Sequence, residues 1–332
     1  MMSRAKTILI AALLTCAGGA DALQAQDYSD PALEIGGAMI DYLITGQGSL
    51  IPGTPSAFRC HGLQYRDVSN GIIRQLREAI VFKYERQMEG ELFIPKDVTV
   101  GVDRFHIVGF NDGALRNLNI SAVNLPPDIR TIPNDCFYSC YNLAEVKFHG
   151  ETTYLENNAF GLCHSLRTIH LPSSVKYIGD HCFDQSGLVE FVVPKSVEFL
   201  GSYAFSGCKS LRKITFTGHR LNDLQGYTFN GCESLEEVVL PPGLETIMSY
   251  AFLDSGLTRI TVPASVSKIY SYAFNGTRLA RIDLLAKNPP ACGKLFTAND
   301  LARIELHVPR GTLAAYRSAP LWQKFVNIID DL

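Results

Sequence analysis

The sequence lacks an excess of charge of either sign. Lysine and arginine number 30 against 33 aspartate and glutamate, which gives a net charge of −3 at pH 7. Proteins that bind nucleic acid or anionic membranes concentrate positive charge on one surface. The balance therefore argues against nucleic acid and against an anionic bilayer as partners.

Long apolar runs are missing after Ala25. A membrane-spanning helix needs about 20 consecutive apolar residues, and no later stretch reaches that length. We therefore expect no membrane span.

The start of the chain has the pattern of an export signal. Arg4 and Lys6 precede an apolar stretch, and Leu23-Gln24-Ala25 suits a cleavage site. We interpret residues 1–25 as a signal peptide, which places the protein outside the cell or on its surface. The alternative is a lipoprotein signal that ends at Cys16, in which case Cys16 carries a lipid anchor.

Catalytic motifs are also missing. The sequence has no G-x-S-x-G, no glycine-rich phosphate loop and no H-E-x-x-H. We therefore expect no enzymatic activity and no cofactor. Residues 26–90 lie outside the regular pattern described next, so an enzyme confined to them is a third hypothesis.

A repeat with a period of about 23 residues dominates the rest of the chain. Its most regular feature is an aromatic position, occupied by Phe137, Phe160, Phe183, Phe205, Phe229, Phe252 and Phe274, with Leu115 in the corresponding place at the front. After this position comes a run of L-x-x-I-x-L type, and before it stands a pair of apolar residues of V-x-x-I type, broken only at Thr152. The pattern predicts a solenoid whose coils each hold one strand, a second short strand and a tight turn.

The phrase from Ala159 to Gly179 resembles the BspA-like branch of leucine-rich repeats, found in secreted and surface bacterial proteins. The segment Asn288-Pro289-Pro290, followed by Ile304 to Gly311 and then Trp322, is similar to the closing segment of that branch. The resemblance covers about residues 79 to 332. It implies a mainly β, right-handed solenoid of α/β type with parallel strands, coils of about 23 residues, short helical turns and capped ends. It also points towards adhesion or contact with host proteins.

We divide the chain after the signal peptide into three parts. Residues 26–78 form an N-terminal cap or irregular segment, residues 79–284 the solenoid, and residues 285–332 a C-terminal cap continuous with it. We expect strands at Ala79–Tyr84 and Ile304–Val308 and a helix at Thr312–Ala319, and we expect the period to stop after Leu284. The side chains predicted to cover the final coil are Tyr316, Trp322, Phe325 and Ile328.

The cysteines are predicted to be structural. Cys140, Cys163, Cys208 and Cys232 all stand three residues after the aromatic position, where other coils have Ser186, Ser255 and Thr277. A position that accepts these types is a small, buried packing position, and we predict no disulfides. A zinc site built from Cys163, His164, His170, His181 and Cys182 lacks the usual ligand spacing.

Two surfaces are candidates for binding. The first is formed by outward strand positions of the central coils, whose columns continue to Arg281 and Asp283. Its members are Glu190, Val192, Lys213, Thr215, Glu237, Val239, Arg259 and Thr261. The mixture of valine, threonine and charges of both signs suits a protein partner, although an ordinary solvated sheet face remains the alternative.

The second candidate surface is a column of tyrosines two residues before the aromatic position: Tyr203, Tyr227, Tyr250 and Tyr272. Stacked tyrosines suit recognition, including that of sugar rings; alternatively, they simply pack on one another. The leading hypothesis is an exported, non-catalytic module that recognises an extracellular or host protein. The alternative is a carbohydrate-binding surface protein that uses the tyrosines.

Overall fold

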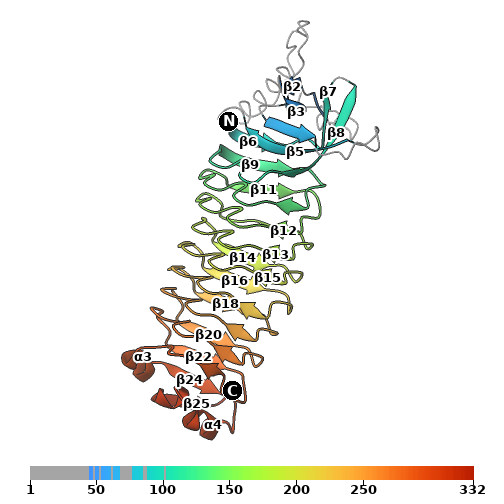
Figure 1. The fold of residues 1–332 in the computed structure, drawn as a ribbon. Helices are drawn as coiled ribbons and strands as arrows, with labels where there is room; N and C mark the ends of the chain where they lie inside the picture. Colours follow the sequence, from blue (N-terminus) through green and yellow to red (C-terminus); the bar gives the residue numbers. More distant parts are fainter. Residues whose placement is uncertain are drawn as a thin grey trace, which may run out of the picture.

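The structure is a computed structural model that describes residues 45–47, 49–51, 54–60, 63–67, 77–84, 88–100 and 102–332. The predicted signal peptide, with Cys16, lies outside the described residues, and residues 26–78 are described only in part. The described chain forms an elongated stack of coils, with a sheet at its N-terminal end and short helices at its C-terminal end (Figure 1).

Seven strands form the N-terminal sheet, in the order β1-β7-β8-β5-β4-β3-β2. Their bounds are Thr45–Gln47 (β1), Ser49–Ile51 (β2), Thr54–Cys60 (β3), Leu63–Asp67 (β4), Arg77–Tyr84 (β5), Asp97–Val100 (β7) and Asp103–Phe110 (β8). The strand predicted at Ala79–Tyr84 is confirmed as part of β5. His106 of β8 joins this sheet to the first coil, because its two ring nitrogens lie 2.9 Å from Asp97 Oδ1 and 3.0 Å from Asp128 Oδ2.

The longer strands run in parallel down one side of the stack, which we call the long-strand face (Figure 1). They are Glu89–Phe93 (β6), Asn119–Leu125 (β9), Glu145–Phe148 (β11), Glu190–Val193 (β14), Lys213–Phe216 (β16), Glu237–Val239 (β18), Arg259–Val262 (β20), Arg281–Leu284 (β22), Glu305–Val308 (β24) and Asn327–Asp330 (β25). Hydrogen bonds join them into three sheets, β11-β9-β6, β14-β16-β18 and β20-β22-β24-β25.

One predicted strand of this face is absent. The L-x-x-I-x-L pattern predicts a strand at Leu166–Leu171, but that segment has no regular structure, so the first two sheets are separate. Ile169 is still buried, and Val189 N donates to Arg167 O at 3.0 Å. The coil therefore keeps its inward packing although the strand ladder is interrupted.

The second short strand predicted for each coil is confirmed. These strands form two parallel sheets on another side of the stack, β10-β12-β13-β15 and β17-β19-β21-β23. Their bounds are Thr131–Ile132 (β10), Tyr154–Leu155 (β12), Tyr177–Ile178 (β13), Phe199–Leu200 (β15), Asp223–Leu224 (β17), Thr246–Ile247 (β19), Lys268–Ile269 (β21) and Ala291–Cys292 (β23).

The aromatic position forms a continuous column of rings in the core. From Phe137 to Phe274 every ring is almost completely buried, and successive rings stack face to face with centroids 5.3 to 5.7 Å apart. Because each ring contacts only the coils before and after it, the core is continuous along the stack and has no single centre.

Each turn around the aromatic position uses left-handed backbone twice. The residue two before the ring and the residue two after it have positive φ in every regular coil, as in Tyr203 (φ 58°) with Gly207 (67°) and Tyr227 (59°) with Gly231 (66°). Left-handed backbone closes tight turns, and glycine and asparagine adopt it most easily. The repeated geometry explains why the turn has a fixed length.

The C-terminal segment adds α3 (Ala298–Arg303), α4 (Leu313–Ser318) and the 3₁₀ helix η1 (Trp322–Lys324). The strand and helix predicted here are confirmed as β24 and α4, whereas α3 and β25 were not predicted. The expected end of the period at Leu284 is only partly right, because Phe296 follows Phe274 at the spacing of the earlier rings and continues the ring column. Tyr316, Trp322, Phe325 and Ile328 are buried, as predicted.

Candidate binding surfaces

The outward positions of β14, β16 and β18 align across the long-strand face. Glu190 pairs with Lys213 and Lys213 with Glu237, while two residues further along Val192 pairs with Thr215 and Thr215 with Val239. Val192 is 57% exposed and Val239 43% exposed. The outward positions of these three strands therefore form two aligned rows, with two exposed apolar side chains beside a row of charged ones.

Two of the charged side chains in this row form an ion pair with each other. Lys213 Nζ lies 2.9 Å from Glu237 Oε1, and this contact raises the pKa of Lys213. Both side chains are exposed, so solvent screens the pair and it adds little stability. The surface at Val192 and Val239 is therefore nearly neutral apart from Glu190.

Arg259 and Thr261 of the predicted set lie on β20, in the next sheet. Arg259 turns towards Asp283, with its Nη2 2.8 Å from Asp283 Oδ2, and Arg281 Nε lies 2.7 Å from the other carboxylate oxygen. The expected exposure of Asp283 is wrong, since its side chain is only 4% exposed. The two guanidinium groups cover it, because a buried carboxylate needs charged donors.

The tyrosine column is a stack of parallel rings that begins at His181. We call His181, Tyr203, Tyr227, Tyr250 and Tyr272 the tyrosine ladder. Successive ring centroids are 4.6, 4.5, 4.8 and 5.4 Å apart, and the planes differ by at most 15°. At its far end Lys294 Nζ stands 5.8 Å from the centroid of Tyr272, in a cation–π arrangement.

In the tyrosine ladder the ring faces are covered by the neighbouring rings. A sugar that stacks on tyrosine needs a free face, but each inner ring has a neighbouring ring on both sides. The half-buried tyrosines therefore offer edges and hydroxyl groups to solvent, and the interpretation that they pack on one another fits these distances.

Tyrosine is an unusual residue at the backbone positions of the tyrosine ladder. The equivalent residues of earlier coils are Asp135 and Asn158, two residue types that tolerate positive φ. The tyrosines have φ between 58° and 63°, which disfavours a bulky side chain. Stacking between neighbouring rings offsets this cost.

The cysteine positions are buried, as predicted, and they also donate hydrogen bonds. The thiol three residues after each ring points to the carbonyl oxygen of the ring residue one coil earlier. The contacts are Cys163 to Phe137 (3.3 Å), Cys208 to Phe183 (3.0 Å) and Cys232 to Phe205 (3.1 Å). The serine and threonine at this position in other coils do not make the same contact: Ser186 Oγ lies 3.3 Å from Cys208 Sγ, and Thr277 Oγ1 donates to Phe274 O of its own coil.

Burial keeps these thiols protonated. It raises the pKa of Cys140 and of Cys208 to about 12, so neither is a nucleophile at neutral pH. The described cysteines Cys136, Cys140, Cys163, Cys182, Cys208, Cys232 and Cys292 are free. Among the described residues, no three histidine, cysteine or acidic side chains come together as metal ligands.

A further aromatic stripe was missed. Tyr154, Tyr177 and Phe199 lie next to one another on the short strands, with centroids 6.3 and 4.8 Å apart. Their shared position six residues before the core ring could have shown them. Across the part of the chain that the structure describes, helices are too short or too polar to cross a membrane.

Comparison with known structures supports the repeat architecture. The chain is similar to a leucine-rich repeat protein from Bacteroides ovatus, with 19% identity and a TM-score of 0.56, covering 81% of this chain and 75% of that one. It is also similar to the T. pallidum leucine-rich repeat protein, with 24% identity and a TM-score of 0.48, covering 57% of this chain and 86% of that one. The first match supports the fold alone.

Sequence comparison identifies the type of repeat. None of the curated proteins matches the chain. The family model described as BspA type leucine-rich repeat region matches with six copies, over residues 106–212, 153–281 and 202–307. Together these matches span residues 106–307, more than half of the chain. The protein therefore belongs to the BspA type of leucine-rich repeat proteins.

Proposed function

We propose that the protein is an exported, non-catalytic recognition module that binds a protein partner on its long-strand face. The observation that carries the proposal is that two exposed valines, Val192 and Val239, are aligned on either side of Thr215. They lie beside the charged row of Glu190, Lys213 and Glu237. Membership of a bacterial leucine-rich repeat family fits a protein-interaction role.

The chemistry of this surface favours a protein over a polyanion. Protein interfaces have an apolar centre that loses its water and a polar rim that stays wet. Val192 and Val239 supply such a centre, and the ion pair of Lys213 with Glu237 supplies part of the rim. A polyanion instead needs an excess of lysine or arginine, and this strip has none.

Binding to a panel of purified extracellular proteins, with a glycan array in parallel, identifies the partner and tests the proposal. The double substitution Val192→Asp with Val239→Asp should leave the melting temperature unchanged, because both side chains face water. It should weaken partner binding at least tenfold by placing charge at the desolvated centre.

Tyr227→Ser with Tyr250→Ser is the matched control on the tyrosine ladder. Partner binding that survives in this variant and falls in the valine variant supports the long-strand face. The reverse pattern would overturn the proposal, and glycan binding lost only in the ladder variant would replace it with the carbohydrate alternative.

Export and surface location form part of the same proposal. Residues 1–25 direct export, and the mature chain begins at Gln26. N-terminal sequencing of protein recovered outside the cytoplasm should start at Gln26. A chain that starts at a fatty-acylated Cys16 would instead establish the lipid-anchored form, and an unprocessed cytoplasmic chain would contradict export.

We also propose that the coils wind right-handedly, as parallel crossovers do, and that residues 26–78 and 285–332 cap the 79–284 solenoid. A cap covers apolar surface that the last coil cannot bury alone. Deleting residues 309–332 should make the protein bind an apolar dye and aggregate. A soluble, cooperatively melting truncation would count against the cap at this end.

A further inference from the structure

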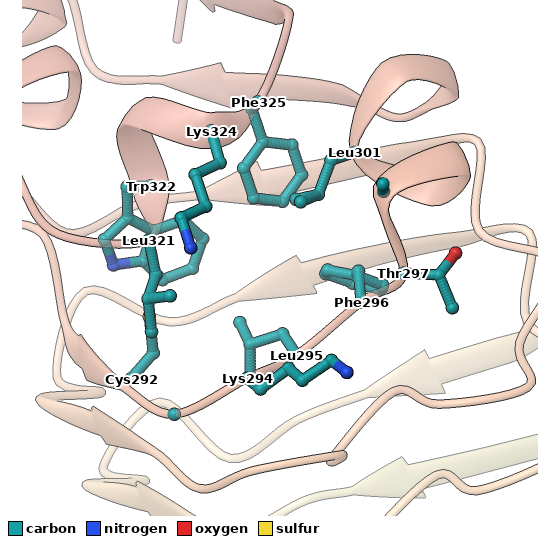
Figure 2. A pocket seen from close by; sticks show the side chains of 12 residues that line it. Cys292, Lys294, Leu295, Phe296, Thr297, Leu301, Leu321, Trp322, Lys324 and Phe325 are labelled. Atoms are coloured by element: carbon teal, nitrogen blue, oxygen red, sulfur yellow. The ribbon is translucent and has the colours of Figure 1, made fainter.

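A pocket of about 510 Å³ lies at the C-terminal end of the stack (Figure 2). It is formed by three segments: the chain after β23, the start of α3, and η1 with its flanking residues. This volume lies within the range of small-ligand sites in proteins. The long-strand face and the tyrosine ladder do not include its residues.

The walls of the pocket are mostly apolar. Figure 2 shows Trp322 and Leu321 on one side and Leu301 on the other, with Phe296 and Leu295 between them. The rings are fixed by the core, because Trp322 stacks on Phe325 with centroids 5.8 Å apart and Phe325 meets Phe296 edge to face at 5.8 Å. The pocket therefore offers a preformed apolar bed.

Two lysines supply positive charge at its rim. Lys294 and Lys324 both line the pocket and both are exposed. Among the described residues neither side chain has an acidic partner, and Lys294 Nζ lies 5.8 Å from the ring centroid of Tyr272. The one acidic residue of α3, Asp300, is already bound to Arg303 at 2.9 Å and to Thr297. The rim is thus left with uncompensated positive charge.

The form of this charge favours a single carboxylate over a phosphate. A phosphate site usually offers backbone amides or arginine forks, and no arginine lines the pocket. Two of the amides at the start of α3 are engaged in a capping box, since Asp300 N donates to Thr297 Oγ1 and Thr297 N donates to Asp300 Oδ2. Lysine presents a compact point charge with three donors and lacks the planar fork of arginine.

We propose that this pocket binds a small carboxylic acid with an aromatic or aliphatic tail. The tail lies against Phe296, Trp322 and Leu301, and the carboxylate points out to Lys294 and Lys324. In this orientation the apolar tail is buried away from water, while the carboxylate stays hydrated at the rim of the pocket.

Binding at this site is non-covalent. Cys292 also lines the pocket, but burial raises the pKa of its thiol to about 11. The thiol is therefore protonated at neutral pH and is a weak nucleophile.

The sole tryptophan of the chain, Trp322, is a direct reporter of occupancy. The probe is 4-bromophenylacetate, whose bromine quenches tryptophan fluorescence on contact, and the uncharged comparison is 4-bromophenylacetamide. We expect saturable quenching by the acid at micromolar to millimolar concentration and weaker binding of the amide. Lys294→Met and Lys324→Met should each lower the affinity for 4-bromophenylacetate by about two- to fivefold, the range expected for exposed ion pairs.

Two variants complete the test. Lys287→Met removes an exposed lysine outside the pocket and should leave binding unchanged. Ala298→Phe places a ring at the pocket mouth and should abolish saturable quenching while the melting temperature stays within a few degrees. Linear, non-saturating quenching of the wild type would overturn the proposal. So would equal affinity for acid and amide, or undiminished binding in folded Ala298→Phe.

Discussion

Phe274 and Phe296 stack face to face, with ring centroids 5.9 Å apart and planes 9° apart. The contact extends the core column one coil past the last regular repeat. The column ends at Phe325, which meets Phe296 at 82° and so turns an edge towards it. The C-terminal segment is thus built on the same core as the repeats that precede it.

The ring column should account for much of the stability of the stack. Phe205 is fully buried between Phe183 and Phe229, with centroids 5.4 and 5.7 Å away. Phe205→Ala should lower the free energy of unfolding by about 3–5 kcal/mol, because it removes a core ring and leaves a cavity. Urea denaturation followed by circular dichroism measures the change. Phe205→Leu, which fills part of the space, should cost clearly less; equal midpoints for wild type and Phe205→Ala would show that the ring is not a core element.

Ser255 stands three residues after the core ring of its coil, the position where cysteines of other coils donate a hydrogen bond. Its hydroxyl is buried without a hydrogen-bond partner, whereas Cys232 one coil earlier donates to Phe205 O. Ser255→Cys should raise the free energy of unfolding by about 1 kcal/mol, because an unsatisfied polar group is replaced by a longer donor. Thermal melting detects this gain.

Ser186→Cys is the matched control for that prediction. Ser186 Oγ already lies 3.3 Å from Cys208 Sγ, so its replacement should bring no comparable gain. A melting temperature for Ser255→Cys at or below the wild type would contradict the assignment of Ser255 as an unsatisfied donor.

The positive φ of Tyr227 makes an unusual comparison possible. Tyr227→Asn and Tyr227→Val both remove stacking on Tyr203 and Tyr250, but asparagine tolerates left-handed backbone and valine resists it. We expect the asparagine variant to be more stable than the valine variant by about 1–2 kcal/mol. Chemical denaturation of the two variants decides the point. Equal stability would mean that the backbone at this position relaxes out of the left-handed region.

Asp283 should give the fold an acid-sensitive contribution. Burial alone would raise the pKa of Asp283, but hydrogen bonds and charge from Arg259 and Arg281 outweigh it and hold the pKa below its ordinary value of 3.8. The stabilisation is therefore complete above the unfolded pKa and is lost as the pH falls through the lower folded pKa. Asp283→Asn should cost about 1.5–3 kcal/mol at pH 7.

The pH series supplies the check on that prediction. The difference in melting temperature between Asp283→Asn and wild type should begin to shrink as the pH falls below the ordinary value of 3.8. It should vanish only below the lower folded pKa, where the wild-type carboxyl is also neutral. Asp254→Asn, at an exposed position, should show no such trend. A difference that stays constant from pH 7 to pH 2 would rule out a charge-based role for Asp283.

Much of this architecture could be predicted from residue spacing. The ring column, the short strands and the outward direction of Val192 and Val239 follow from a fixed period and from strand alternation. Such patterns are local, and each coil repeats them. They sufficed to place the tyrosines in one column and the cysteines inside.

Features that depend on contacts between different parts of the chain were harder to predict. Asp283 occupies an outward position in the period but is buried, with Arg259 and Arg281 paired to its carboxylate. Phe296 follows a segment broken by Pro289 and Pro290, which hides its place in the period. The pocket at Trp322 combines segments that meet only after folding. Spacing also cannot tell whether a ring presents its face or its edge, which decides what the tyrosine ladder can bind.

The parallel register of the long strands affects how the length of such a molecule can change during evolution. A coil contacts only the coil before it and the coil after it, and Glu190, Lys213 and Glu237 show that equivalent positions stay aligned. Duplicating one coil in the middle of the chain would therefore leave both ends intact and extend the face by roughly 4.8 Å. The length of the stack can therefore change in steps of one whole coil. Recombination within the gene could add or remove a coil without changing the residues that form the core.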